Sequence, residues 1–144
     1  MRISRHEMFR EILEIIKKRS TCSRKQVAAI IEKDGRIIST GYAGAPSGLP
    51  HCIDIGCEIG KDGGCIRTVH AEANAISQAA RHGVSINKSS IYVTASPCYN
   101  CFSLIINSGI KKIVYYEFYR DERILEISRK LGIDLFQVNP TITL

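Results

Sequence analysis

The chain has 144 residues, a length typical of one domain, and its 44% hydrophobic content is enough for one sizeable core. No apolar run reaches the roughly 18 residues of a membrane-spanning helix, and the N-terminus lacks the apolar core of an export signal, so we expect a cytoplasmic protein without a membrane partner. The formal net charge of +6 favours anionic partners, either phosphorylated small molecules or nucleic acid, although a solvated basic surface is the commoner cause of such a charge.

The first part of the chain predicts one helix and one hairpin. Residues 4–19 carry apolar side chains on one broad stripe, which is typical of an amphipathic helix that packs on a core, and Ser4 is its expected N-cap. Residues 27–31 and 36–42 are strand-like and flank Asp34-Gly35, a pair typical of a type I′ turn. We therefore expect two strands of a sheet here.

The segment of about residues 43–69 has little hydrophobic periodicity and is rich in glycine and cysteine. It predicts a long ordered loop, inserted into a single domain of residues 1–144. Loops of this length are usually functional, and an irregular segment needs something to hold it in place.

After residue 70, helices and strands alternate along the chain. In order, the expected elements are a helix at 70–82, a strand at 90–94, a helix at 98–107, a strand at 112–116, a helix at about 122–131 and a strand at 133–138. This alternation implies parallel strands with right-handed crossovers. Together with the hairpin it predicts an α/β fold, a three-layer α/β/α sandwich with a mixed sheet of about five strands.

Three side chains have the spacing of ligands to one catalytic metal ion: His70, Cys98 and Cys101. A tetrahedral zinc ion held by three protein ligands keeps its fourth position open for water, as in catalytic sites. His70 and Glu72 are two residues apart and cannot both face a metal on the flank of a helix, so the ion should lie beyond the helix start. Glu72 is then an acid that is not a ligand.

The two cysteines are expected on the first turn of the second helix. Cys98 and Cys101 are three residues apart and therefore share one helix face, and Ser96 is the expected cap of that helix. Two helix starts would then point at one ion. Their dipoles and N–H groups favour the thiolate form of cysteine and can receive an oxyanion.

These motifs, with several others, identify the chain as similar to deoxycytidylate (dCMP) deaminases of the cytidine deaminase superfamily, over about residues 19–138. The matching stretches are Arg19-Ser20-Thr21-Cys22, Gly35 to Tyr42, Gly44 to Cys52, Thr68-Val69-His70-Ala71-Glu72, and Ser96-Pro97-Cys98 with Cys101. The patterns H-x-E and P-C-x-x-C are shared across zinc-dependent nucleobase deaminases. The segment Gly-Tyr-x-Gly-x-Pro-Ser-Gly at 41–48 narrows the resemblance to the deoxycytidylate branch.

The resemblance implies hydrolytic deamination of dCMP to dUMP and ammonia, a step that supplies precursors of dTMP. It implies a catalytic zinc on His70, Cys98 and Cys101, which lowers the pKa of a bound water. Glu72 is expected to move protons between that water, N3 of the pyrimidine and the leaving ammonia. The backbone N–H of Ala71, together with that of Cys98, is expected to bind the base or the oxygen at the metal.

The resemblance also implies that Tyr42, Ala43, Gly44 and Ser96 line the nucleoside pocket. Most relatives have asparagine where this chain has Ala43, and in the family that side chain contacts the sugar. Loss of one such hydrogen bond typically costs about 0.5 to 1.5 kcal/mol. Position 43 therefore bears on substrate identity and not on reaction type.

A nucleotide phosphate needs cations near the pocket, and our candidates are Arg24 and Arg81. For either residue, a solvated charge on the surface of a basic protein is an equally good interpretation.

Four cysteines remain after the catalytic pair: Cys22, Cys52, Cys57 and Cys65. A second, structural zinc on these four would explain how the irregular loop is ordered, because metal binding can replace a missing core. Viral and bacterial members of the resembling family often carry such a zinc, at positions that match Cys22 and Cys52. The alternatives are a ligand set that includes His51, free buried thiols, or a disulfide.

Other functions stay open at this point. A tRNA adenosine deaminase, or a nucleoside or base deaminase of the same fold, is the alternative enzyme. A zinc-stabilised nucleic-acid-binding module is the non-enzymatic alternative, and Glu72 argues against it because a structural zinc needs no neighbouring acid. The resemblance implies a homo-oligomer, from dimer to hexamer, while the sequence does not decide whether dCTP and dTTP act as effectors.

Overall fold

The computed structural model describes residues 1–119 and 121–139; Arg120 and residues 140–144, which the predicted domain also includes, lie outside the described part. Five strands form one mixed sheet with the order β2-β1-β3-β4-β5. The strands are β1 (Ala28–Lys33), β2 (Arg36–Tyr42), β3 (Ser90–Ala95), β4 (Lys112–Glu117) and β5 (Asp134–Gln137). The helices are α1 (Arg5–Lys17), α2 (Cys52–Ile55), α3 (Ala71–Arg81), α4 (Tyr99–Asn107) and α5 (Arg123–Leu131).

The predicted hairpin and helix at the N-terminus are confirmed. β1 and β2 pair antiparallel, and their turn has positive φ at Asp34 (54°) and Gly35 (79°), as a type I′ turn requires. The side chain of Ser4 accepts a hydrogen bond from the backbone N–H of Glu7 and caps α1.

The predicted alternation after residue 70 is also confirmed. β3 pairs parallel with β4, and β4 pairs parallel with β5, whereas β1 pairs antiparallel with β3. Because β3 and β4 run the same way, the segments that follow Ala95 and Glu117 leave the sheet at the same edge. Helix α4 and the end of the β4 strand are thereby brought close together.

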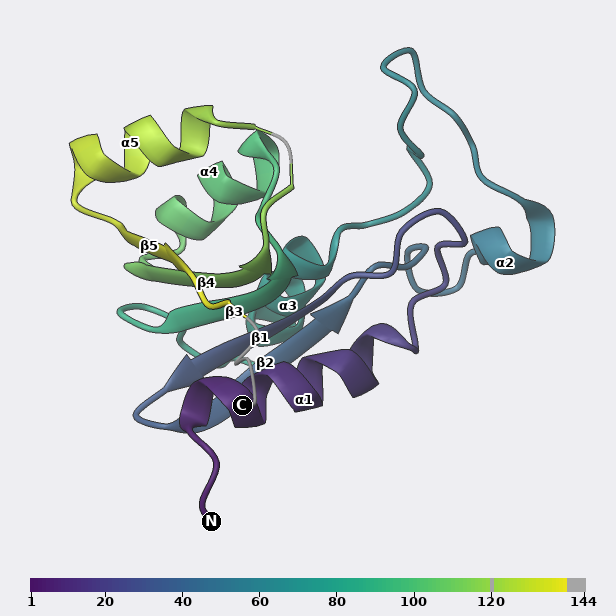
Figure 1. The fold of residues 1–144 in the computed structure, drawn as a ribbon. Coiled ribbons are helices and arrows are strands. Elements are labelled where there is room, and N and C mark those ends of the chain that lie inside the picture. The colour runs from purple at the N-terminus through teal and green to yellow at the C-terminus, as the bar shows by residue number, and fades with distance from the viewer. Residues whose placement is uncertain (120, 140–144) are drawn as a thin grey trace.

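Two apolar clusters on opposite faces of the sheet give the predicted three layers (Figure 1). Along β1, Ala28 and Ile30 pack with Phe9 and Leu13 of α1. On the opposite face, alternate strand residues pack with α3, α4 and α5, through Ala75, Phe102 and Ile124 among others. The alternation follows from the two-residue period of a strand, which sends successive side chains to opposite faces.

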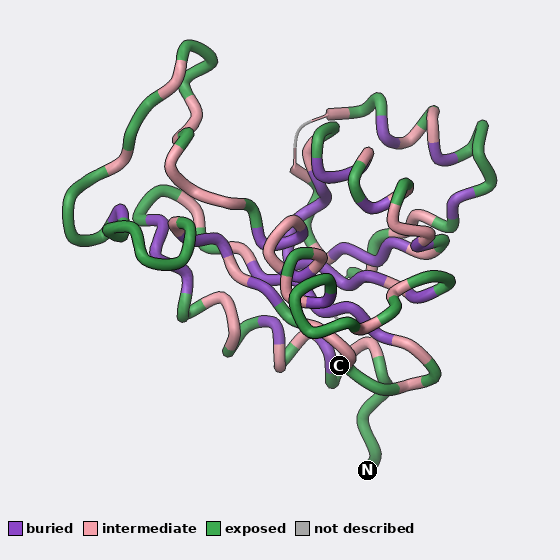
Figure 2. The backbone as a smooth tube through the Cα atoms, turned by 180° about the vertical axis from the view of Figure 1, so that it is seen from behind, coloured by how far each residue is buried: buried purple, intermediate pink, exposed green. Residues whose placement is uncertain are grey.

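The segment between β2 and α3 is the long loop that the sequence predicts, with the four-residue helix α2 inside it. We call residues 56–66 the arm; Figure 1 shows it projecting away from the sheet and helices. None of its residues is buried (Figure 2). One isolated bridge, between Ile59 and Cys65, closes the arm, and another, between Gly44 and Val69, ties the two ends of the loop together.

The predicted cap of α4 is wrong. Cys98, with φ −67° and ψ 167°, is the N-cap of this helix, and Ser96 lies two residues before it. The Ser96 hydroxyl donates to the carbonyl of Tyr119 at 2.9 Å and accepts from its N–H at 2.7 Å. Tyr119, which follows the neighbouring parallel strand β4, therefore bonds the hydroxyl that the sequence predicts as the cap of α4.

Among the described residues, every helix is too short or too polar to cross a membrane.

Candidate metal centre and active-site cavity

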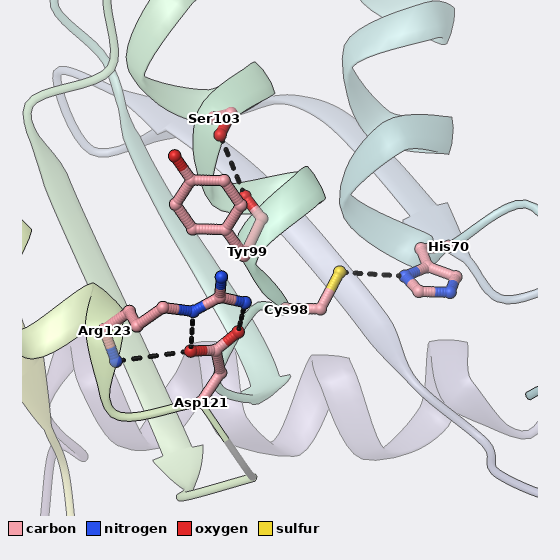
Figure 3. Close-up of polar contacts among 6 residues, drawn as sticks. All are labelled: His70, Cys98, Tyr99, Ser103, Asp121 and Arg123. Atoms are coloured by element: carbon pink, nitrogen blue, oxygen red, sulfur yellow. Dashed lines mark hydrogen bonds and ion pairs between the residues drawn. The ribbon is translucent and has the colours of Figure 1, made fainter. Parts of the chain in front are cut away.

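Two helix starts converge at the candidate catalytic metal centre. His70 is the N-cap of α3, Cys98 is the N-cap of α4, and Cys101 lies on the first turn of α4. His70 Nδ1 lies 3.5 Å from Cys98 Sγ and 3.4 Å from Cys101 Sγ. Figure 3 shows the His70 ring and the Cys98 sulfur facing each other from the two helices.

The donor set fits zinc. Zinc–sulfur and zinc–nitrogen bonds of about 2.3 and 2.0 Å at a tetrahedral angle give an N···S separation of roughly 3.5 Å. The separations from His70 Nδ1 to both sulfurs match this value, and the three ligand atoms lie within 4.8 Å of one another. One imidazole and two sulfurs also leave one tetrahedral position for water or substrate.

The surroundings of the two thiols move their pKa values in opposite directions. The hydrogen bond with Cys101 and that with His70 lower the pKa of Cys98 to about 4. The same hydrogen bond between the sulfurs, together with burial, raises the pKa of Cys101. Cys98 is therefore the thiolate of the pair, and the positive end of the α4 dipole adds to its stabilisation.

Glu72 lies on the first turn of α3 and is 4% exposed. Burial raises the pKa of its carboxyl, and the hydrogen bond with Cys101 and the charge of His70 only partly oppose this effect. A carboxyl with a raised pKa holds a proton closer to neutral pH than an exposed one does. This property suits a group that takes up and returns protons during a reaction.

The start of α4 is also tied to α5. The Arg123 guanidinium lies 4.5 Å from the ring centroid of Tyr99, the residue that follows Cys98 (Figure 3). It also forms a two-point contact with the carboxylate of Asp121, at 2.6 and 2.8 Å. The segment after β4 is thereby joined to the helix that carries both cysteines.

A cavity of about 570 Å³ opens at the metal centre. Its lining includes nine of the residues predicted for catalysis, metal binding or substrate binding: Cys22, Arg24, Ala43, Cys65, His70, Ala71, Glu72, Ser96 and Cys98. The cavity is large enough for a small-molecule ligand. The remaining ligand of the first centre, Cys101, is buried behind it at 4% exposure.

Three predicted substrate contacts do not line the cavity. Tyr42 and Gly44 stand on either side of Ala43, with the carbonyl of Tyr42 bonded to Asn74 and Gly44 paired to Val69. The structure also does not bring Arg81 to the cavity. It lies on the last turn of α3, roughly 15 Å from the start of that helix at 1.5 Å per residue.

The cavity has lining residues that the sequence does not assign to the site: Lys25, Asp62, Asn100 and Tyr119. Lys25 Nζ lies 3.3 Å from the ring centroid of Tyr119 and 3.9 Å from a carboxylate oxygen of Glu117. Tyr119 follows β4, so knowledge of the parallel β3–β4 pairing would have indicated its place next to the end of β3. Asn100 lies within the C-x-x-C motif. The motif therefore predicts that Asn100 is near the candidate metal centre, but it assigns no function to this side chain.

Three of the four remaining cysteines form a second cluster. The sulfurs of Cys52, Cys57 and Cys65 lie within 4.8 Å of one another, and those of Cys52 and Cys65 are 3.7 Å apart. Burial raises the pKa of Cys65, but hydrogen bonds from Thr68 and from backbone N–H groups outweigh it and bring the value to about 6. All six cysteines are free thiols.

Cys22 and His51 stand apart from this cluster. Cys22 is 6% exposed and lines the cavity together with Cys65, but it is not among the three sulfurs that lie close together. His51 is exposed at the start of α2, with no side-chain hydrogen bond to that helix. The structure thus brings together three of the four predicted ligands.

Residues 3–117 match the model of the cytidine and deoxycytidylate deaminase zinc-binding region. The chain belongs to this family. The matched range contains the two helix starts and Glu72.

Relatives of this deaminase include ComE operon protein 2 of Bacillus subtilis, which is 41% identical over 95% of the chain and 72% of the relative. Deoxycytidylate deaminase of Enterobacteria phage T4 is 35% identical over 89% of the chain and 86% of the relative. Among solved structures, dCMP deaminase of the cyanophage S-TIM5 in complex with dCMP and dUMP has a TM-score of 0.82 and 32% identity. That similarity covers 96% of this chain and 99% of the phage chain.

Proposed function

We propose that this deaminase converts dCMP and water to dUMP and ammonia, with residues 1–144 acting as one domain and residues 43–69 as an insertion. The observation that carries the proposal is the placement of Glu72 beside the candidate ligands His70, Cys98 and Cys101, at a cavity that Glu72, His70 and Cys98 line. The similarity to a phage enzyme bound to dCMP and dUMP supports the choice of substrate.

A zinc ion on His70, Cys98 and Cys101 supplies, when bound, a water of lowered pKa. The Glu72 carboxylate accepts a proton from this water and donates it to N3 of the pyrimidine, which makes C4 more electrophilic. The oxygen of water adds to C4. Glu72 then takes the proton of the resulting C4 hydroxyl and delivers it to the exocyclic amino group; the C4–N bond breaks, ammonia leaves, and a carbonyl forms at C4.

Backbone groups at the two helix starts stabilise the charge that develops in this reaction. Ala71 is the first residue of α3 and lines the cavity, and Cys98 caps α4. The first N–H groups of a helix have no partner within it and carry partial positive charge. Preorganised donors of this kind bind negative oxygen more strongly in the transition state than in the substrate.

The phosphate of the nucleotide requires a cation, and Arg24 is the proposed contact. Arg24 lines the cavity, and its Nη1 donates to the carbonyl of Gly63 in the arm at 2.8 Å. A guanidinium has five N–H donors, so this bond orients the group and leaves further donors for phosphate oxygens. Lys25 adds a second positive charge to the same lining.

A second, structural zinc is proposed on Cys52, Cys57 and Cys65. Their short mutual distances and the low pKa of Cys65 support ligation, because zinc binds the thiolate. Cys22 is the candidate for the fourth ligand, since its buried thiol lines the same cavity as Cys65. This site would hold an arm that has no buried residue of its own.

We also propose a cytoplasmic homo-oligomer. Six free thiols are typical of a reducing compartment. Exposed aliphatic side chains gather on the loop between β2 and α3, at Leu49, Ile53, Ile55, Ile59 and Ile66. Exposed apolar surface of this kind commonly marks a protein contact, and a second copy of the chain fits the expected oligomer. dCTP and dTTP are candidate effectors on the strength of the resemblance alone.

A substrate panel tests the proposed reaction. Ammonia release is measured with dCMP, CMP, deoxycytidine, cytosine and a tRNA stem-loop, with the zinc-loaded protein. We expect the highest kcat/KM with dCMP, because Arg24 and Lys25 add phosphate binding to the common chemistry. Equal kcat/KM values for dCMP and deoxycytidine would contradict the nucleotide assignment, and turnover of the stem-loop alone would favour a tRNA deaminase.

A further inference from the structure

Two backbone segments meet beside the candidate metal centre. Gly44 and Val69 form a short antiparallel bridge, with N–H···O distances of 3.2 and 2.8 Å. Their neighbours Ala43, Thr68 and His70 line the cavity. The geometry of this bridge therefore decides where the cavity wall at Ala43 stands relative to the metal ligand His70.

The Asn74 carboxamide bonds to both segments. Its Nδ2 lies 2.8 Å from the carbonyl oxygen of Tyr42 and 3.4 Å from that of Val69. The backbone N–H of Asn74 also closes the first turn of α3, on the carbonyl of His70 at 2.9 Å. One residue on the helix thus contacts the end of β2, the residue before the metal ligand, and the metal ligand itself.

Close packing of β2 on α3 leaves little freedom for this arrangement. A Cβ atom at Gly41 would collide with the carbonyl of Ala71 and the backbone nitrogen of Ala75. The strand therefore approaches the first turns of the helix at backbone contact. At this separation a short carboxamide reaches the carbonyl of Tyr42 directly.

We propose that Asn74 is a positioning residue, which holds residues 42–44, and with them the cavity-lining Ala43, in register with the candidate metal ligand His70. The inference rests on the proposed function only for its kinetic readout. The chemistry explains the residue type, because an amide nitrogen carries two N–H donors for two carbonyl oxygens. A carboxylate of the same shape has no donor at neutral pH and would repel both oxygens.

The test compares N74A and N74D with the matched control S39A. Ser39 Oγ donates to the carbonyl of Ala75 at 2.6 Å, so it also joins β2 to α3, but neither residue lines the cavity. We expect N74A to raise the KM for dCMP about tenfold, the effect of one or two net hydrogen bonds, with a smaller change in kcat. N74D should be worse, N74Q should recover part of the loss, and S39A should leave KM unchanged.

Hydrogen exchange gives a readout that does not depend on the substrate. We expect the amides of Gly44 and Val69 to exchange faster in N74A and N74D than in the wild-type protein, while S39A leaves them unchanged. If N74A does not fold, N74Q and S39A carry the comparison. Unchanged exchange at Gly44 and Val69, or equal KM changes in N74A and S39A, would overturn the inference. Absence of dCMP turnover by the wild-type protein would instead refute the proposed substrate.

Discussion

Glu72 is the residue at which burial and charge most clearly serve the chemistry. An ionised carboxylate loses hydration when it is buried, so the 4% exposure of Glu72 is unfavourable for its charged form. Burial accordingly raises its pKa, while its contacts with Cys101 and His70 work in the opposite direction. A raised pKa makes this carboxyl a better proton donor and acceptor in a reaction than an exposed glutamate would be.

The variant E72Q tests this role. Glutamine keeps the size of the side chain but cannot carry the proton, so we expect kcat for dCMP to fall by about a hundredfold or more. Zinc content should stay unchanged because Glu72 is not a ligand. Stability should not decrease, since a buried carboxyl is replaced by a neutral group. Wild-type ammonia release by zinc-loaded E72Q would disprove the assigned role.

Of the two arginine candidates for phosphate binding, Arg24 lines the cavity and Arg81 does not. We expect R24A to raise the KM for dCMP about tenfold or more, because a charge-assisted hydrogen bond is lost, and to leave the KM for deoxycytidine nearly unchanged. R81A is the matched control, since Arg81 lies at the far end of α3 and outside the cavity lining. Steady-state kinetics on both substrates make the comparison. Equal effects of R24A on dCMP and deoxycytidine would point to an indirect role through Gly63.

At the scale of elements, helix α1 covers one face of the sheet through an aromatic contact at its start. The centroid of the His6 ring lies 5.6 Å from that of Tyr92 and 5.7 Å from that of Phe136. The backbone carbonyl of His6 accepts a 2.6 Å hydrogen bond from the Tyr116 hydroxyl. Among the described residues, the buried Nδ1 of His6 has no hydrogen-bond partner. This contact suits a neutral imidazole.

Docking of α1 should therefore depend on pH. Burial lowers the pKa of His6 from 6.5, and the charges of Lys112 and Arg5 lower it further, against Glu32, which raises it. Below pH 6.5 the unfolded chain binds a proton that the folded chain does not, so the unfolding free energy decreases as the pH falls. We expect this decrease to be smaller in H6F, measured by denaturant unfolding between about pH 7 and 5. Parallel pH profiles for the two proteins would show that His6 contributes nothing.

At the scale of the whole molecule, two cysteine-containing centres share one cavity. Cys98 belongs to the catalytic centre and Cys65 to the second cluster, and both line the same space. The arm that carries Cys65 also meets Arg24 through Gly63. If the proposed second zinc is bound, its loss should affect substrate binding as well as stability.

Zinc stoichiometry tests this connection. We expect two zinc ions per chain in the purified protein and one in C57S, with a lower Tm because the binding energy of a structural zinc is folding energy. The KM for dCMP should rise in C57S while the catalytic zinc is retained. H51A is the control, and it should keep both ions if His51 is not a ligand. One zinc in the wild-type protein would exclude the second site.

The amino-acid sequence alone predicted most of the elements and the three side chains that meet at the candidate metal centre. Helix and strand periodicity, the Asp34-Gly35 turn and the cap at Ser4 are local properties, and the structure confirms each of them. His70, Glu72 and the two cysteines of the C-x-x-C motif were also identifiable locally. A short motif at a helix start fixes both the ligand types and the direction in which they point.

Only the tertiary structure decided which distant residues serve the cavity. Arg24 lies in the cavity lining, but Arg81 does not. The Ser96 hydroxyl bonds to Tyr119 and does not cap α4. The tertiary structure also joined Asn74 to Tyr42, which lies 32 residues away in the sequence. Such contacts depend on strand order and on the packing of β2 against α3. Local patterns of one sequence carry no record of these long-range pairings, because periodicity and capping report only on neighbours within a few turns.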